Sequence, residues 1–432
     1  MNKKIKILTL GAHPLSASGI GTQTKYFIEA MLKTGKYKFF CLGGAMKHEN
    51  YDLVKTDEWG DDWVIKPIDG YGSQDLLRSI MRTQKPDIVW FMTDPRFWHW
   101  LWHIDHEIKA LAPMIYYHVW DNFPPPTFNK TFYDSNDFVA TISKVTDKLV
   151  GLVSPEVDHE YIPHVVDETI FKKYLQEEVE RFKKSGIVQE KNFINKDGNK
   201  KFVFFWNNRN ARRKQSGSII FWFKDFLDRV GHDKACFIMH TDVKDVHGQD
   251  LEAIIKELGL TNGEVMFSTN KYPPETLAKI YCLADCTINV ADAEGFGLAT
   301  FESLACETPI IVTMTGGLQE QVTDGEEWFG IGIEPSSKAI IGSQEIPWIY
   351  EDRLNGNEVV DAMEKIYNMT EEEREELGRK GRNHVVTKYN REKIMKKWDD
   401  LLTKIYNELG SWENRKNYKS WEFKEVIWNL KR

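Results

Sequence analysis

The stretch that decides the fold is Asp292-Ala-Glu-Gly-Phe-Gly-Leu-Ala-Thr-Phe-Glu-Ser-Leu-Ala-Cys306. The apolar run at residues 286–291 predicts a buried strand, the two glycines predict a turn, and the residues after them predict a helix. A helix that begins after such a turn directs free backbone N–H groups at a bound anion. Carboxylates are poor phosphate ligands but good acceptors for sugar hydroxyls. Because Glu294 and Glu302 flank the turn, the corner suits a ligand with both phosphate and hydroxyl groups, which suggests a nucleotide sugar.

Short apolar runs alternate with helical spacing along two separate parts of the chain. They lie at residues 5–10, 39–42, 87–92, 114–117 and 138–142, and again at residues 202–206, 235–239, 264–267, 287–290 and 309–313. Continuous apolar strands that alternate with helices indicate parallel sheets covered on both faces. The sequence therefore predicts an α/β protein with two Rossmann-like domains, whose ligands bind in a cleft at the carboxyl ends of both sheets.

A polar, charged stretch separates the two parts and is typical of an interdomain connection. The predicted boundaries are residues 1–168 for the first Rossmann-like domain, 169–200 for the connection, 201–385 for the second domain, and 386–432 for C-terminal helices that return to the first domain. Residues 340–353 fit none of the expected elements.

Composition limits the class of protein. The chain has 432 residues, of which 41% are hydrophobic and 28% charged, as in an ordinary globular protein. The net charge of −8 does not suggest a dedicated nucleic-acid binder. Five scattered cysteines favour reduced thiols in the cytoplasm, and no apolar run is long enough for a membrane helix, although peripheral membrane contact stays open. We expect no metal site, because no ligand cluster with metal-binding spacing stands out.

Basic residues follow the first strand of the second domain. Arg209 and Lys214 are five residues apart there, with Arg212 and Arg213 as further candidates. A departing nucleoside diphosphate gains negative charge, and fixed cations stabilise that charge best. The alternative is a solvated basic loop.

Two segments of the first domain carry further candidates. Gly19 and Gly21 form a turn after the first strand, either as a plain strand-to-helix connection or as a small-residue loop that lets a diphosphate approach the backbone. His118 and Asp121 follow the strand at residues 114–117. Asp121 could orient an acceptor hydroxyl or take its proton, whereas His118 could also be a satisfied structural residue.

The corner at residues 292–306 resembles the Glu-x7-Glu signature of the retaining glycosyltransferases of family 4, the glycosyl transferases group 1. Arg209 and Lys214 match that family's Gly-Arg-x4-Lys-Gly element, with Asn208 and Gln215 in place of the glycines. Other segments in the family's order and spacing are residues 85–89, 161–167, 265–268, 272–277, 281–285, 309–312 and 316–320.

The resemblance implies the GT-B fold, with an acceptor-side first domain and a donor-nucleotide second domain. It implies transfer of a sugar from a nucleoside diphosphate sugar, UDP- or GDP-linked, to an acceptor hydroxyl with retention of configuration. The donor is a substrate, and neither a metal nor a cofactor is expected. The implied catalytic residues, with Asp121 added from the reasoning above, are His118, Asp121, Arg209, Lys214 and Glu294.

By the same resemblance, Glu294 and His118 contact the donor sugar and Glu302 accepts from the nucleotide ribose. The implied donor-binding residues are Gly19, Gly21, Phe296, Gly297, Leu298, Glu302, Gly316 and Gly317. For the carboxylates, the alternative is an ordinary helix N-terminal charge and an exposed helix glutamate.

Other functions stay open. A nucleotide-sugar epimerase or a glycan phosphorylase could share the two-domain cleft, and a non-catalytic nucleotide-sugar-binding protein belongs to a different class. The acceptor could be a glycan, a lipid-linked sugar, a protein or hydroxymethylated DNA. Donor discrimination depends on a few contacts, so the nucleotide, the sugar, the linkage and the oligomeric state also stay open.

Overall fold

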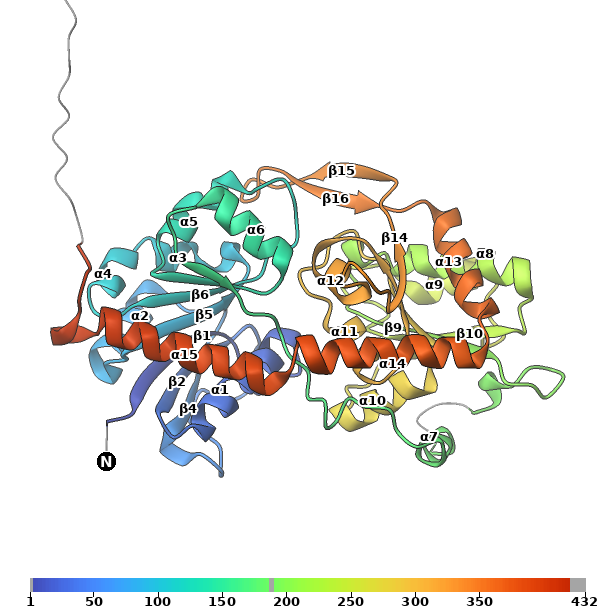
Figure 1. The fold of residues 1–432 in the computed structure, drawn as a ribbon, viewed down its shortest axis with the longest axis horizontal. Helices are drawn as coiled ribbons and strands as arrows, with labels where there is room; N and C mark the ends of the chain where they lie inside the picture. The colour runs from blue at the N-terminus through green and yellow to red at the C-terminus, as the bar shows by residue number, and fades with distance from the viewer. Residues whose placement is uncertain (1–2, 186–189, 420–432) are drawn as a thin grey trace, which may run out of the picture.

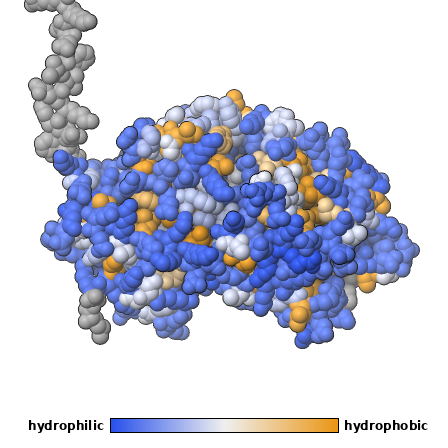
Figure 2. Space-filling view, viewed as in Figure 1, coloured by the Kyte–Doolittle hydropathy of each residue, from blue (hydrophilic) through white to orange (hydrophobic). Residues whose placement is uncertain are grey.

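The computed structural model describes residues 3–185 and 190–419. Figure 1 shows two α/β lobes side by side, with long C-terminal helices running across one face of both. On the same face, hydrophobic side chains gather only in small groups among hydrophilic ones (Figure 2). Within the described residues, no helix is long and apolar enough to cross a membrane.

The first lobe is built on a sheet that has eight strands within the described residues, in the order β3-β4-β2-β1-β5-β6-β7-β8. The strands are parallel except for the antiparallel edge pair β3–β4. They are β1 (Ile5–Ala12), β2 (Tyr37–Gly44), β3 (Val54–Lys55), β4 (Trp63–Pro67), β5 (Ile88–Thr93), β6 (Met114–His118), β7 (Phe138–Thr141) and β8 (His159–Tyr161). The helices that cover it are α1 (Gly19–Lys33), α2 (Gln74–Gln84), α3 (His99–Trp102), α4 (Asp105–Lys109), α5 (Lys130–Asp134) and α6 (Lys144–Val153).

The second lobe contains a parallel sheet that has six strands in the described part of the chain, in the order β11-β10-β9-β12-β13-β14. They are β9 (Phe202–Asn207), β10 (Ala235–His240), β11 (Val265–Ser268), β12 (Cys286–Asn289), β13 (Ile310–Thr313) and β14 (Gly330–Ile333). The helices of this lobe are α8 (Ser216–Val230), α9 (Leu251–Glu257), α10 (Pro274–Leu283), α11 (Leu298–Ala305), α12 (Gln319–Val322) and α13 (Gly356–Asn368). The strand order reverses between β9 and β12, and ligands of such sheets bind outside the carboxyl ends at that point.

Three further segments join the lobes. The connection contains α7 (Gln176–Lys183), and residues 186–189 of the predicted connection lie outside the described residues. The unassigned stretch at residues 340–353 belongs to an antiparallel hairpin of β15 (Ser337–Ile341) and β16 (Ile349–Arg353), which lies over both lobes in Figure 1. Helix α14 (Glu371–Lys388) packs on the second lobe and α15 (Arg391–Leu409) on the first.

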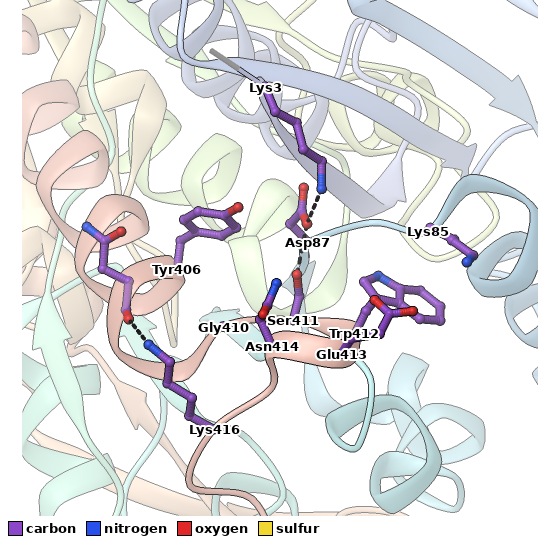
Figure 3. Close-up of a pocket in the computed structure, with 11 residues that line it drawn as sticks. Lys3, Lys85, Asp87, Tyr406, Gly410, Ser411, Trp412, Glu413, Asn414 and Lys416 are labelled. Atoms are coloured by element: carbon purple, nitrogen blue, oxygen red, sulfur yellow. Dashed lines mark hydrogen bonds and ion pairs between the residues drawn. The ribbon is translucent and has the colours of Figure 1, made fainter.

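The C-terminal segment docks on the first lobe. Trp398 of α15 packs against Phe27, with ring centroids 5.1 Å apart. Beyond α15, the Ser411 hydroxyl donates to Asp87 at 2.8 Å, and these residues border a cavity of about 280 Å³ (Figure 3). None of the predicted site residues lines this cavity, so we assign it to the docking of the C-terminal segment. Residues 1–2 and 420–432 of the predicted terminal segments lie outside the described residues.

Candidate functional site

The glycine corner lies between β12 and α11, where the sequence places it. Gly297 has a φ of +94°, a conformation that L side chains rarely adopt, and α11 begins at Leu298 immediately after it. No side chain of the described residues caps the start of α11. The first N–H groups of a helix lack intrahelical partners, so this end of α11 can bind an anion. Phe296 lies within the corner and packs its ring against His164 of the first lobe.

The glycine pair after β13 packs directly against this corner. Gly316 has a φ of +47°, and a Cβ atom there would run into the carbonyl group of Glu294. A Cβ atom on Gly317 would lie 2.6 Å from the carbonyl oxygen of Gly295, and the Gly317 N–H donates to the Glu294 carbonyl at 3.0 Å. The pair therefore fixes the backbone next to Glu294, while its predicted contact with the donor stays a prediction.

Lys214 meets Glu294 across the point where the strand order reverses. Lys214 follows β9 and Glu294 follows β12, and their charged groups form an ion pair whose side chains are only 9% and 12% exposed. The Asn289 side-chain amide donates to the same Glu294 carboxylate at 3.3 Å. A residue pair separated by 80 positions is thus brought together by two adjacent parallel strands.

Arg213 extends this cluster to the first lobe. Its guanidinium donates to the carbonyl oxygen of Ala293 and lies 3.5 Å from the Asp121 carboxylate. We define the candidate catalytic cluster, called the catalytic cluster below, as Asp121, Arg213, Lys214 and Glu294. The family motif in the sequence matches Arg209 rather than Arg213. Arg213 is only a further candidate in the sequence, because its position next to Lys214 is the only signal for it.

Arg209 has a different environment. It forms two hydrogen bonds to Asp245, at 2.6 and 3.0 Å, and its side chain is 60% exposed. The two cations of the predicted motif therefore have different environments. Lys214 is buried against Glu294, whereas Arg209 is exposed to solvent and paired with Asp245. The catalytic role of Arg209 stays a prediction.

The surroundings shift the pKa values of the two carboxyl groups of the cluster in opposite directions. Burial raises the pKa of Asp121, and Glu294 adds to that rise while Arg213 opposes it. Burial also acts to raise the pKa of Glu294, but the nearby charges of Lys214 and Arg213 outweigh it and hold this pKa below its usual value. Glu294 is therefore an anion at neutral pH, whereas Asp121 binds a proton more readily than an exposed aspartate does, a direction that favours a base.

Glu302 lies on α11, and its side chain is partly buried rather than fully exposed. Its carboxylate accepts a hydrogen bond from the Tyr281 hydroxyl at 2.8 Å, and that hydroxyl accepts one from Asn207 at 2.9 Å. Burial raises the pKa of Glu302 to about 7, and the Tyr281 hydroxyl opposes the rise. The alternative of a freely solvated helix glutamate is therefore wrong, while the ribose contact stays a prediction.

The first-lobe glycine loop faces the same corner. A Cβ atom on Gly19 would lie 2.9 Å from a methyl carbon of Leu298, so the loop abuts the start of α11. Gly21 is enclosed by its own loop, since a Cβ atom there would lie 2.8 Å from the carbonyl oxygens of His13 and Ser16. The structure thus brings Gly19 next to the corner and gives both predicted glycines a packing role.

His118 has a buried environment at the end of β6. Its ring is fully buried, and its two nitrogens lie 3.0 Å from the Tyr116 hydroxyl and 2.8 Å from the Tyr133 hydroxyl. Burial lowers the pKa of His118 to about 3, so the ring is neutral. These contacts fit the alternative of a satisfied structural residue, while the predicted contact of His118 with the donor sugar stays a prediction.

Comparisons with known proteins bear on the family and the fold of the chain. Residues 188–384 match the model of the family described as glycosyl transferases group 1. A D-inositol 3-phosphate glycosyltransferase from Acidothermus cellulolyticus is 40% identical over 76 residues, which are 18% of this chain and only 16% of that protein.

Two solved structures cover nearly the whole chain. Sucrose-phosphate synthase from Thermosynechococcus elongatus has a TM-score of 0.72 and 15% identity, covering 94% of this chain and 100% of that one. HepE from Anabaena, in complex with UDP and glucose, has a TM-score of 0.66 and 13% identity, covering 93% and 100%.

The two facing lobes and these likenesses confirm the predicted GT-B fold. Within that class, the match to the glycosyl transferases group 1, the family that the corner resembles, covers residues 188–384 and so falls mainly on the second lobe.

Proposed function

We propose that this protein transfers a sugar from a nucleoside diphosphate sugar, UDP- or GDP-linked, to an acceptor hydroxyl with retention at the anomeric carbon. The observation that carries the proposal is the convergence of Lys214, Arg213 and Glu294 beside the uncapped start of α11. The match of residues 188–384 to the glycosyl transferases group 1 and the likeness to HepE, solved with UDP and glucose, support it.

In the proposed reaction, the bond between the anomeric carbon and the diphosphate oxygen breaks as the acceptor oxygen forms its bond to that carbon. The acceptor hydroxyl's proton passes to the departing phosphate oxygen or to Asp121. Lys214, Arg213 and the N–H groups at the start of α11 stabilise the charge that develops on the diphosphate. Glu294, held as an anion, accepts hydrogen bonds from donor-sugar hydroxyls.

These cations supply the positive charge in the proposal, and it includes neither a metal nor a cofactor besides the donor substrate. In residues 3–185 and 190–419, no cluster of three or more His, Cys, Asp or Glu side chains is placed to hold a metal ion. The proposed location is the cytoplasm, and the proposed acceptors are a glycan, a lipid-linked sugar, a protein or hydroxymethylated DNA.

The first experiment is a thermal-shift panel of nucleoside diphosphate sugars, because a true donor raises the melting temperature in proportion to its binding. The stabilising donor is then incubated with acceptors, and NMR records the anomeric configuration of the product. A product of inverted configuration would contradict the proposal.

The same donor distinguishes the proposed transferase from the alternative functions. Isomerised sugar from donor alone would indicate an epimerase, and phosphate-dependent cleavage of a glycan would indicate a phosphorylase. Donor binding without a product from any acceptor would indicate a binding protein.

A further inference from the structure

The β15–β16 hairpin, which no sequence motif explains, crosses from the second lobe to the first. The Tyr350 N–H donates to the Phe123 carbonyl at 2.6 Å, and the Asn122 side-chain amide donates to the Tyr350 carbonyl at 2.7 Å. Ile346, between the two strands, is buried in a small cluster with Trp120 and Leu149 of the first lobe. The hairpin is therefore attached to the first lobe by both hydrogen bonds and apolar packing (Figure 1).

The base of the hairpin is fixed to the loops that carry the catalytic cluster. The Glu351 side chain is 4% exposed and receives two hydrogen bonds from Arg212, at 2.6 and 2.7 Å. Arg353 forms an ion pair with buried Asp292, and the Asp352 N–H donates to the Asp292 carbonyl at 2.9 Å. Because Arg212 and Asp292 lie two residues before Lys214 and Glu294, the hairpin has a fixed position relative to the proposed reaction centre.

A cavity of about 330 Å³ lies between the hairpin and the two lobes. Asp121 and Phe123 line it from the first lobe, Gly316 from the second, and Lys338 and Tyr350 from the hairpin. Asp121 also belongs to the catalytic cluster, and Gly316 packs on the Glu294 carbonyl, so the cavity adjoins the proposed reaction centre. Its volume lies at the lower end of the range for small-molecule sites, roughly 300–1,000 Å³.

The lining combines aromatic rings with an excess of negative charge. Three carboxylates, those of Asp121, Glu334 and Asp352, line it with a single lysine, Lys338, and Arg213 lies against Asp121 from outside the lining. Carboxylates accept hydrogen bonds from hydroxyl groups and repel a phosphate or another carboxylate. The rings of Phe123 and Tyr350 add apolar surface of the kind that packs against the C–H face of a sugar.

We propose that this cavity is the acceptor subsite, that the β15–β16 hairpin forms its wall, and that it takes an uncharged sugar or polyol in preference to a phosphorylated one. This inference rests on the proposed function and specifies its acceptor. The proposed preference for uncharged acceptors distinguishes this chain from the matched relative whose name specifies D-inositol 3-phosphate.

The test uses the full chain with the donor found by thermal shift and matched acceptor pairs, such as glucose with glucose 6-phosphate and myo-inositol with its monophosphate. We expect kcat/KM to be about tenfold or more higher for the uncharged member of a pair, because the like charges of the lining oppose the phosphate. Equal or better use of the phosphorylated members would overturn the inference.

A charge reversal in the lining sharpens the test. Glu334 is exposed, so Glu334→Lys should fold, and it should shift the preference toward the phosphorylated acceptor several-fold. Glu345→Lys is the matched control, since Glu345 is an exposed residue of the same hairpin that does not line the cavity. An equal shift in both variants would show a long-range charge effect and overturn the subsite.

Donor binding distinguishes this inference from the proposed function. If no nucleoside diphosphate sugar stabilises the protein, the proposed function fails as well. If the donor binds but no acceptor in the panel reacts, saturation-transfer NMR with the nucleoside diphosphate bound measures acceptor binding directly. Absence of binding by every uncharged sugar would then overturn the inference while the donor site stands.

Discussion

Two strand-to-helix corners face each other across the cleft, and they differ in how each helix start is satisfied. In the first lobe, the Ser18 hydroxyl caps α1 by accepting a hydrogen bond from the Gly21 N–H at 3.1 Å. In the second lobe, α11 follows Gly297 with no side-chain cap among the described residues. Because a helix start without a cap keeps its N–H groups for a ligand, the comparison favours the α11 corner as the phosphate site.

The two corners also differ in the charges that surround them. Charges of Arg213, Lys214 and Glu294 gather at the α11 corner, with Lys214 and Glu294 largely buried, whereas the α1 loop contributes a close approach of Gly19 to Leu298. The glycines of similar appearance thus have different physical roles. Those of the second lobe shape the start of α11, where we propose that the phosphate binds, and Gly19 makes room for the other lobe.

The largest expected effect comes from removing the charge at the α11 corner. Lys214→Met keeps the apolar stem but removes the cation, and we expect kcat to fall about 10²–10³-fold, as for loss of one oxyanion-stabilising group. The variant should also lose about 3 kcal/mol of unfolding free energy, because Glu294 is left buried without its partner. Steady-state kinetics and urea titration provide the two measurements.

Lys224→Met is the matched control for this variant. Lys224 of α8 also forms an ion pair, with Asp228, but both residues are on the surface of the second lobe. Turnover and stability should stay close to wild type in the control. Turnover near wild type in Lys214→Met would remove the charge-stabilising role from this corner.

The sequence predicts this corner better than any other part of the molecule, and the reason is physical. Apolar runs predict β9 and β12, and residues that follow adjacent parallel strands necessarily meet at one edge of the sheet. That rule places the residues after β9 next to those after β12 without knowledge of any side-chain contact. Local pattern and topology therefore bring the ends of β9 and β12 together, but they do not decide whether Arg209 or Lys214, which both follow β9, meets Glu294.

Packing between distant segments is what the sequence does not predict. His118 is the last residue of β6, at the end of the sheet where ligands bind, but the hydroxyls of Tyr116 and Tyr133 contact both of its nitrogens. The β15–β16 hairpin carries no strand pattern that pairs it with the first lobe, and buried Glu351 depends on Arg212, which lies 139 residues away. Such contacts depend on three-dimensional arrangement rather than on local periodicity.

The second prediction concerns Glu302 on α11. Its pKa is raised from 4.5 to about 7 in the folded protein, so the folded state holds this proton more tightly than the unfolded state. The resulting stabilisation is fully present below pH 4.5 and is lost as the pH rises through 7, a change of about 3 kcal/mol. Glu302→Gln lacks this change, so its unfolding free energy should rise relative to wild type between pH 4.5 and 8.

Urea titrations of both proteins across this pH range measure the difference. The carboxyl group of Glu320, whose pKa burial also raises to about 7, is present in both proteins and cancels. Donor affinity of wild type should rise over the same range, since ribose hydroxyls donate to the ionised carboxylate. A constant stability difference would contradict the buried environment of Glu302.

The third prediction compares a glycine from each corner. Gly316→Ala forces an alanine into a positive φ and places its Cβ atom against the Glu294 carbonyl, so we expect a loss of about 2 kcal/mol or more of unfolding free energy. Gly19→Ala meets only the flexible end of Leu298 and should lose less than about 1 kcal/mol. Thermal unfolding of both variants checks the order, and the reverse order would contradict the assigned roles.

The smallest effect is expected at the cap of α1. Ser18→Ala removes the hydroxyl that satisfies the Gly21 N–H, and loss of such a cap costs about 1 kcal/mol of unfolding free energy. Ser73→Ala at the start of α2 is the matched control, because the Ser73 hydroxyl caps its helix in the same way through the Leu76 N–H and belongs to neither corner. Both variants should lose similar stability and bind the donor like wild type. A donor affinity that falls about tenfold in Ser18→Ala alone would mean that the α1 corner holds the phosphate after all, since only a ligand at that helix start depends on how its N–H groups are arranged.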